Sequence, residues 1–201
     1  MRGFSDAERE RIRLELLAVG RELFGRYGLD KTTIADLTEP VGIANSTFYQ
    51  FFDSKEELYF RILQAEGEEL AEAIVRDSLA SVEDPQEAIE TFLTLLVAEI
   101  ETNPLVQQLL LEDALEDVRG EMTEAELVAE REAGLAYLVP FIERWQETGQ
   151  VRAGDPATLA ATLSLVKTVT LYREDLGEAL YPDVRDTFIE VVAAGLTRTD
   201  E

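Results

Sequence analysis

The stretch TTIADLTEPVGIANSTFYQFFDSK, residues 32–55, decides how the chain begins to fold. Thr33 is followed three residues later by Asp36, the spacing of a capping box, which predicts that a short helix begins there. Pro40 disfavours helical geometry in the residue before it, so this helix is expected to end near Glu39. The stretch therefore opens with one short helix that has a defined start and end.

A second short helix is expected directly after the first. Gly42 supplies the tight turn, and Asn45 or Ser46 can cap a helix that runs to about Phe52. Ser54 then begins a third, longer helix in the same way. Two short helices across a glycine-containing turn are typical of a helix-turn-helix, whose second helix can enter the major groove of DNA.

A set of residues spread over roughly positions 10–60 extends this pattern at fixed spacing. They are Leu23-Phe24, Gly28, Thr32-Thr33, Val41-Gly42-Ile43, Thr47-Phe48-Tyr49, Phe52 and Ser54-Lys55-Glu56. On these residues the chain resembles the DNA-binding domain of the TetR family of transcriptional regulators. It departs from the family pattern at Pro40, where a small helix former is usual, at Ala44, usually serine, and at Ser46, usually glycine.

The resemblance implies an all-α protein with two domains. A helix-turn-helix DNA-binding domain would span residues 1–53, and a helical ligand-binding and dimerisation domain would span residues 54–201. Apolar residues recur at helical spacing beyond the matched stretch, which predicts about nine helices in all. Pro140 lies inside one of them and can kink it. The helices expected outside the helix-turn-helix cover 5–28, 54–79, 84–103, 104–111, 123–147, 156–174 and 182–196.

The charge of the chain is extreme and uneven. Its 201 residues carry a net charge of −24 and only three lysines, Lys31, Lys55 and Lys167. Residues 1–64 have a net charge of −2, whereas residues 65–201 carry −22. A face that binds phosphate is therefore expected only on the first part. The surface fits a protein adapted to molar salt, and an ordinary acidic protein is the alternative.

The absence of two residue types excludes several kinds of catalytic and metal-binding chemistry. The chain has no cysteine and no histidine, which removes disulfides, thiolate catalysis, the commonest metal ligand and the commonest general base. We therefore expect no cofactor and no catalytic or metal site. No apolar run approaches the length of a membrane span and the N-terminus lacks a signal region, so we expect a cytoplasmic protein that does not bind membranes.

The candidate DNA-binding residues lie on and around the second short helix. Thr47, Tyr49 and Gln50 are placed to touch DNA, and glutamine can form two hydrogen bonds with the edge of adenine. The resemblance implies that Thr33, Tyr49 and Lys55 contact the phosphate backbone. The alternative is that Tyr49 packs in the core and Lys55 is an ordinary surface lysine. The predicted set is Thr33, Asn45, Ser46, Thr47, Tyr49, Gln50 and Lys55.

The last two predicted helices are the candidate dimer interface. The resemblance implies that they pair with their copies as a four-helix bundle. Residues 156–172 carry a single charge, on Lys167, and such a length is more apolar than one buried face requires. The alternative is that these helices form internal core. The candidate interface residues are Leu159, Leu163, Thr170, Phe188, Val191, Val192 and Gly195.

The resemblance also implies a small-molecule pocket among the middle helices of the acidic domain. An aromatic stripe at helical spacing is more often plain core than a pocket, and nothing in the sequence identifies the ligand. The candidate residues are Phe92, Leu96, Leu109, Tyr137, Phe141, Trp145 and Val166.

These observations favour a DNA-binding regulator, a repressor that acts as a homodimer on a palindromic operator and is released by a small-molecule effector. An enzyme is the first alternative, because paired carboxylates such as Glu112-Asp113 are numerous. A di-iron bundle of the usual kind needs Glu-x-x-His, however, and there is no histidine. The second alternative is a helical protein-interaction module that no longer binds DNA.

Overall fold

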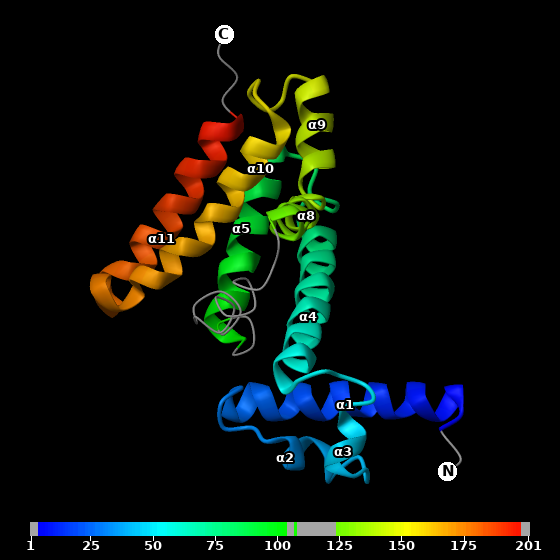
Figure 1. Ribbon diagram of the computed structural model, residues 1–201. Coiled ribbons are helices and arrows are strands. Elements are labelled where there is room, and N and C mark those ends of the chain that lie inside the picture. Colours follow the sequence, from blue (N-terminus) through cyan, green and yellow to red (C-terminus); the bar gives the residue numbers. More distant parts are fainter. Residues whose placement is uncertain (1–3, 104–106, 108–123, 198–201) are drawn as a thin grey trace. The chain divides into compact units, whose positions relative to one another are not determined.

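A computed structural model describes residues 4–103, 107 and 124–197. Every regular element in these ranges is a helix, which confirms the all-α prediction (Figure 1). The chain divides into two units. The N-terminal unit comprises the described residues up to Glu68 and residue 107, and the C-terminal unit comprises Glu69–Asn103 and 124–197. Within the described ranges, no helix is both long enough and apolar enough to cross a membrane.

The N-terminal unit contains α1 (Asp6–Tyr27), α2 (Ile34–Thr38), α3 (Asn45–Phe48) and the start of α4 (Lys55–Asp77). Gly20 brings α1 close to α4, because a Cβ atom there would lie 2.7 Å from Cδ1 of Ile62. The core of the unit consists of Ile12, Leu16, Phe24, Leu37, Phe48, Phe52, Leu58, Tyr59, Ile62 and Leu63.

The capping box at the start of α2 is confirmed. The Thr33 hydroxyl accepts from the backbone N–H of Asp36, and the Asp36 carboxylate accepts from that of Thr33. Gly42 has a φ of 73°, the left-handed conformation that glycine adopts freely. The predicted cap of the second helix is wrong. Its N-cap is Ala44, which has no side chain to cap with, and the helix ends at Phe48, followed by a turn.

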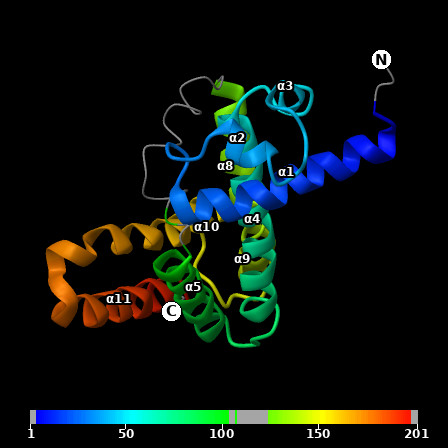
Figure 2. The same cartoon turned by 90° about the horizontal axis from the view of Figure 1, so that it is seen from below.

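The C-terminal unit is built around α5 (Pro85–Thr102), which packs against the last helices of the chain. The segment formed by α10 (Pro156–Ser164) and the 3-10 helix η1 (Leu165–Tyr172) runs out, and α11 (Arg173–Thr197) runs back beside it, so the end of the chain forms a helical hairpin (Figures 1 and 2). The unit also contains α8 (Glu124–Leu135) and α9 (Val139–Glu147).

Proline does not act as predicted in this unit. Instead of kinking one long helix, Pro140 lies in the first turn of α9, where its missing N–H costs nothing, and a turn separates α9 from α8. Pro182 does not begin the last helix, because α11 starts at Arg173 and leaves helical geometry at Gly177. The helix expected over 156–174 continues as 3-10 rather than α-helix after Ser164. The predictions for 104–106 and 108–123 lie outside the described residues.

Candidate nucleic-acid interface

The segment from α3 to the following turn separates buried aromatic residues from exposed polar ones. Phe48 is fully buried and Phe52 nearly so, and their rings lie 5.9 Å apart. Tyr49 is 56% exposed, and its ring meets that of Phe48 edge-on at 5.6 Å. Among the other candidates on this segment, Thr47 is half-buried, and Asn45, Ser46 and Gln50 are exposed. The two phenylalanines thus hold a polar face outward.

Arg9 on α1 holds the turn that follows α3, a role that the sequence analysis missed. Its guanidinium donates to the backbone carbonyl of Gln50 at 3.0 Å and lies over the ring of Phe51, 5.2 Å from the centroid. The carbonyl of Gln50 is thereby fixed, while its side chain stays exposed. The contact joins residues 41 positions apart, so no local pattern could have indicated it.

Three predicted phosphate contacts, Thr33, Tyr49 and Lys55, line one groove of the N-terminal unit, with a volume of about 450 Å³. The groove also carries carboxylates, which offset its positive charge. The remaining lining residues are Asp30, Thr32, Ile34, Asp53, Ser54 and Glu56. The structure therefore brings the three candidates together, in a setting that is not strongly basic.

Two of these three side chains already have partners within the chain. The ammonium of Lys55 donates to the backbone carbonyls of Leu29 at 2.8 Å and Thr32 at 3.2 Å, which leaves at most one of its three N–H groups for a phosphate. The Thr33 hydroxyl donates to the Asp36 carboxylate at 2.6 Å, and this bond, with the backbone bond, lowers the pKa of Asp36. Tyr49 is the most exposed of the three candidates.

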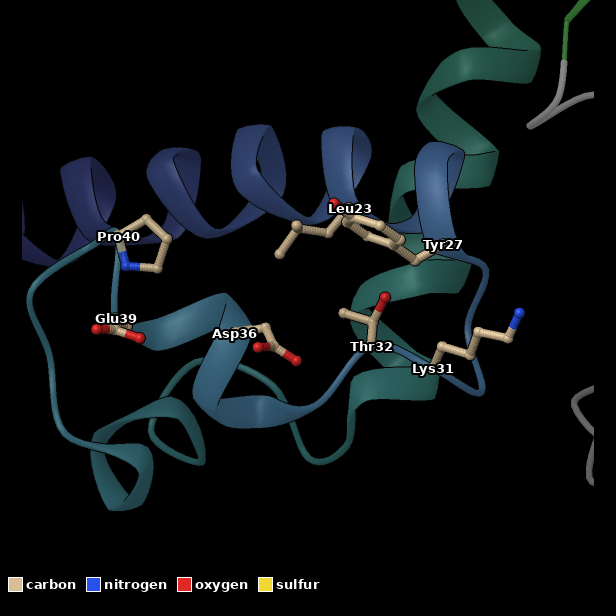
Figure 3. Close-up of a pocket in the computed structure, with 7 residues that line it drawn as sticks. All are labelled: Leu23, Tyr27, Lys31, Thr32, Asp36, Glu39 and Pro40. Carbon is tan, nitrogen blue, oxygen red and sulfur yellow. The ribbon is translucent and has the colours of Figure 1, made fainter.

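A second concave site in the N-terminal unit was not predicted. Leu23 and Tyr27 on α1 face Thr32 and the start of α2 across a cavity of about 500 Å³ (Figure 3). Its rim carries charges of both signs. Lys31 lies near one end, Asp36 lies on α2, and Glu39 directly follows α2. Pro40 completes the lining.

The ligand-binding candidates lie in or against the core of the C-terminal unit. Phe92, Trp145 and Val166 are buried members of this core, and Leu96 and Phe141 pack against it. Tyr137 is half-buried in the turn between α8 and α9. Leu109 lies outside the described residues.

The candidate dimer residues divide by exposure. Leu163 and Thr170 are buried within their own chain, and Leu159 and Val192 are half-buried against its core. The other three candidates, Gly195, Phe188 and Val191, are exposed. Phe188 and Val191 have large side chains. They belong to a wider exposed apolar set on η1 and α11: Leu165, Leu171, Tyr172, Leu180, Phe188 and Val191.

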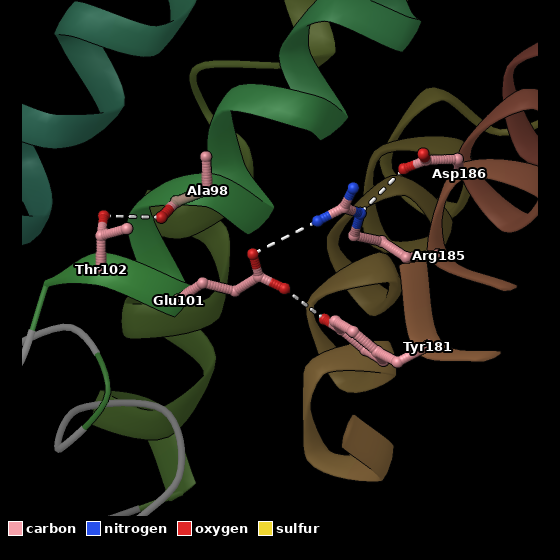
Figure 4. Close-up of polar contacts among 6 residues, drawn as sticks. All are labelled: Ala98, Glu101, Thr102, Tyr181, Arg185 and Asp186. Atoms are coloured by element: carbon pink, nitrogen blue, oxygen red, sulfur yellow. Dashed lines mark hydrogen bonds and ion pairs between the residues drawn. The ribbon is translucent and has the colours of Figure 1, made fainter. Parts of the chain in front are cut away.

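A polar cluster joins α5 to α11 within the C-terminal unit (Figure 4). Tyr181 donates to one carboxylate oxygen of Glu101 at 2.6 Å, and Arg185 donates to the other at 3.3 Å. Burial raises the pKa of Tyr181, and the Glu101 carboxylate adds to the effect. Arg185 also pairs with Asp186 at 2.8 Å. The cluster fixes the end of α5 against α11 rather than forming an open site.

The helical fold, and the exposed polar face of α3 and its following turn, define a protein of the helix-turn-helix class. Residues 16–62 match the profile of the family described as "Bacterial regulatory proteins, tetR family". Residues 16–62 are therefore similar to this TetR family, and the expectation of a TetR-like fold is confirmed.

The curated relatives match only part of the chain. The HTH-type transcriptional repressor KstR2 of Rhodococcus jostii (strain RHA1) is 34% identical over 82 residues, which are 41% of this chain and 40% of that protein. The chain thus spans less than half the length of the curated relatives it matches.

Solved structures match the fold over nearly the whole chain. A TetR-family transcriptional regulator from Pectobacterium atrosepticum has a TM-score of 0.76 at 22% identity, covering 98% of this chain and 100% of that one. FadR from Bacillus subtilis, in complex with stearoyl-CoA, has a TM-score of 0.66 at 14% identity, covering 91% and 98%.

Proposed function

We propose that the protein is a DNA-binding transcriptional repressor that binds a palindromic operator as a homodimer and leaves it when a small molecule binds. The observation that carries the proposal is the face of α3 and its following turn. Tyr49 and Gln50 are exposed there, while Phe48 and Phe52 hold the segment in the core. This division is the one a recognition helix needs to enter the major groove.

Contacts with the DNA backbone would come from the groove lined by Thr33, Tyr49 and Lys55. The groove lies at the N-terminus of α4, whose first N–H groups favour a nearby anion. Tyr49 offers a free hydroxyl, and Lys55 offers charge and one N–H group. Carboxylates also line the groove, so its electrostatic attraction to the DNA phosphates is weak. Contacts with the bases therefore contribute more of the affinity.

Repression is supported by the curated relatives. Both are HTH-type transcriptional repressors, and both are matched over less than half of their length. Repression, as the direction of regulation, therefore rests on those relatives.

A homodimer is supported by the exposed apolar side chains of η1 and α11. Leu165, Leu171, Tyr172 and Val191 are each more than half exposed on a single chain. An apolar set of this kind on the last helices suits a self-complementary two-fold interface. Two-fold symmetry in the protein would match a palindromic operator.

Release by a ligand is supported by the fold relatives and by α4. Two proteins of this fold were solved with stearoyl-CoA and with resorcinol. In this chain the C-terminal core is the place for such a ligand, next to Phe92, Phe141 and Trp145. Helix α4 begins in the N-terminal unit and continues into the C-terminal unit, so a shift of this helix would change the affinity for DNA.

A gel-shift assay with the DNA upstream of the protein's own coding sequence tests the proposal. Wild-type protein should shift this duplex in preference to a shuffled one. Gln50→Ala should reduce the preference, whereas Tyr49→Ala should weaken binding to both duplexes. Thr94→Ala, an exposed residue of α5, is the matched control. Equal binding of both duplexes by the wild-type protein, or an unchanged shift with Tyr49→Ala, would contradict the proposal.

A further inference from the structure

A buried threonine touches the first residue of the recognition helix. Thr38 ends α2 and is 1% exposed, and Asn45 begins α3 and is exposed. Oγ1 of Thr38 lies 2.6 Å from Oδ1 of Asn45. The pair therefore links the interior of the N-terminal unit to the face proposed to meet DNA.

The amide oxygen of Asn45 is the atom that faces Thr38. It lies 2.6 Å from the Thr38 hydroxyl oxygen, a separation typical of O–H···O bonds. The single hydroxyl proton of Thr38 also has the Ile34 carbonyl within reach, at 2.9 Å. Were the proton directed there, two oxygens would face each other at the shorter distance. The Thr38 hydroxyl therefore donates to Oδ1 of Asn45.

This bond occupies the acceptor of the Asn45 amide, Oδ1, and leaves its donor, the Nδ2 amino group, available for other partners. Within the described residues, Nδ2 of Asn45 has no hydrogen-bond partner, and the side chain is exposed. A free asparagine binds adenine through both halves of its amide, accepting from N6 and donating to N7. An asparagine whose oxygen is occupied presents N–H groups alone.

We propose that Asn45 acts at the operator as a hydrogen-bond donor only, and that Thr38 is the positioning residue that makes it one. The inference rests on the DNA-binding function proposed above. In the major groove, guanine, adenine and thymine each offer an acceptor, whereas cytosine offers only its N4 amino donor. Asn45 therefore excludes cytosine at the base it faces and does not select adenine.

Selection from a pool of randomised duplexes, followed by sequencing, tests this with the full-length chain. The position read by Asn45 is the one at which Asn45→Ala loses its preference. There, the wild-type protein should deplete cytosine roughly tenfold, because an N–H group that faces the cytosine amino group is left without an acceptor. Thr38→Val removes the hydroxyl at similar volume and should shift the preference to adenine. Thr38→Ser keeps the hydroxyl and should behave as the wild type does.

Asn45→Asp provides a second variant that leaves Thr38 untouched. It keeps an oxygen for the Thr38 hydroxyl and turns an acceptor outward, so it should favour cytosine, reversing the wild-type preference. A wild-type preference for adenine that survives Thr38→Val, or an Asn45→Ala protein with unchanged preferences, would overturn the inference.

Failure of the proposed function has a different signature. A wild-type protein that enriches no duplex would overturn DNA recognition itself. In that case the Thr38–Asn45 bond is still measurable without DNA, because the side-chain amide signals of Asn45 in a nitrogen-15 NMR spectrum should move in Thr38→Val and stay in Thr38→Ser. Signals unmoved in both variants would show that the bond is absent.

Discussion

Each unit of the chain has its own apolar core, and the two units differ in the surfaces that they present. In the N-terminal unit, short helices are fixed by caps and by single long-range bonds such as the one from Arg9 to Gln50. The C-terminal unit is an apolar core inside a strongly acidic surface, with a further apolar set left exposed on η1 and α11. The surface proposed to bind DNA thus rests on few, specific contacts, whereas the surface proposed for dimerisation rests on apolar area.

The largest effect is expected from removing the aromatic anchor of the recognition helix. Phe48→Ala deletes a fully buried ring and should lower the free energy of unfolding of the N-terminal unit by about 3–5 kcal/mol. Hydrogen exchange of the α1 and α3 amides measures this. The single tryptophan, Trp145, is in the C-terminal core, so the urea midpoint of its fluorescence should stay unchanged.

Phe4→Ala is the matched control for that experiment, because Phe4 is 39% exposed in the same unit and should lose little. Equal shifts of amide exchange and of Trp145 fluorescence in Phe48→Ala would show that the two units unfold as one, and the contrast between them would fail.

The exposed apolar set should be sensitive to charge. Val191→Glu places a carboxylate on a side chain that is 61% exposed in the single chain, so the chain itself should still fold. Burying that charge at a dimer interface should raise the dimer dissociation constant roughly a hundredfold. Light scattering at micromolar concentration measures the change, and Thr94→Glu on α5 is the control. A monomeric wild-type protein would refute the interface.

Lys55 tests whether the N-terminal unit depends on specific polar contacts. Lys55→Met removes two charge-assisted bonds to the carbonyls of Leu29 and Thr32 and should cost about 2 kcal/mol of stability. It should also weaken binding to all DNA sequences about equally. Lys31→Met makes the same charge change at an exposed side chain and should leave stability nearly unchanged. Equal effects of the two would mean that the carbonyl bonds contribute nothing.

Salt should affect the stability of the two parts of the chain differently, because their net charges differ. Residues 65–201 carry −22 against −2 for residues 1–64, and the screening length falls from ~10 Å at 0.1 M to ~3 Å at 1 M. If the surface is adapted to salt, the melting temperature followed by Trp145 fluorescence should rise by several degrees between about 0.1 M and about 2 M potassium chloride. A flat melting temperature over this interval would leave an ordinary acidic regulator.

The smallest effects are expected at two carboxylates in helix caps, one in each unit: Asp36 is the third residue of α2, and Asp155 is the N-cap of α10. Hydrogen bonds from Thr33 and Thr158 hold the pKa values of Asp36 and Asp155 below the ordinary carboxyl range. Each carboxylate therefore adds stability above the pKa of its unfolded form, and this is lost as the pH falls through the lower folded value. Asp36→Asn and Asp155→Asn should each be less stable than wild type at neutral pH.

Urea unfolding at several pH values measures this difference, which should shrink toward zero in acid for both variants. A difference that stays constant with pH would show that the carboxylate charge plays no part in either cap.

The sequence predicted those parts of the structure that depend on neighbouring residues. The Thr33–Asp36 box and the Gly42 turn need only local spacing, and both are present. Phe48 and Phe52 lie four residues apart in the sequence, and both are buried. The cap at the second helix failed because the helix starts one residue earlier than expected, which turns Asn45 from a cap into a partner of Thr38.

Features set by distant residues were out of reach. Neither Arg9 nor the bonds of Lys55 to Leu29 and Thr32 could be read from spacing, because the partners lie 41, 26 and 23 positions away. Pro182 was taken as a helix start, but a break at Gly177 and packing against α5 allow helical structure on both sides of it. Buried and exposed faces of α10, η1 and α11 likewise depend on tertiary contacts.

The close approach at Gly20 has a consequence for how this protein can change over generations. A methyl group there would meet Ile62, Leu58 and Phe24 at 2.7, 3.2 and 3.3 Å. The atom at 2.7 Å is the far end of the Ile62 side chain, so alanine at position 20 requires that side chain to turn away, whereas a larger residue requires position 62 to shrink, for example to valine. The two sites are therefore expected to covary. In an alignment of relatives that keep this crossing of α1 and α4, a larger residue at one site should accompany a smaller one at the other, and lineages should pass between the two pairings through a less stable intermediate.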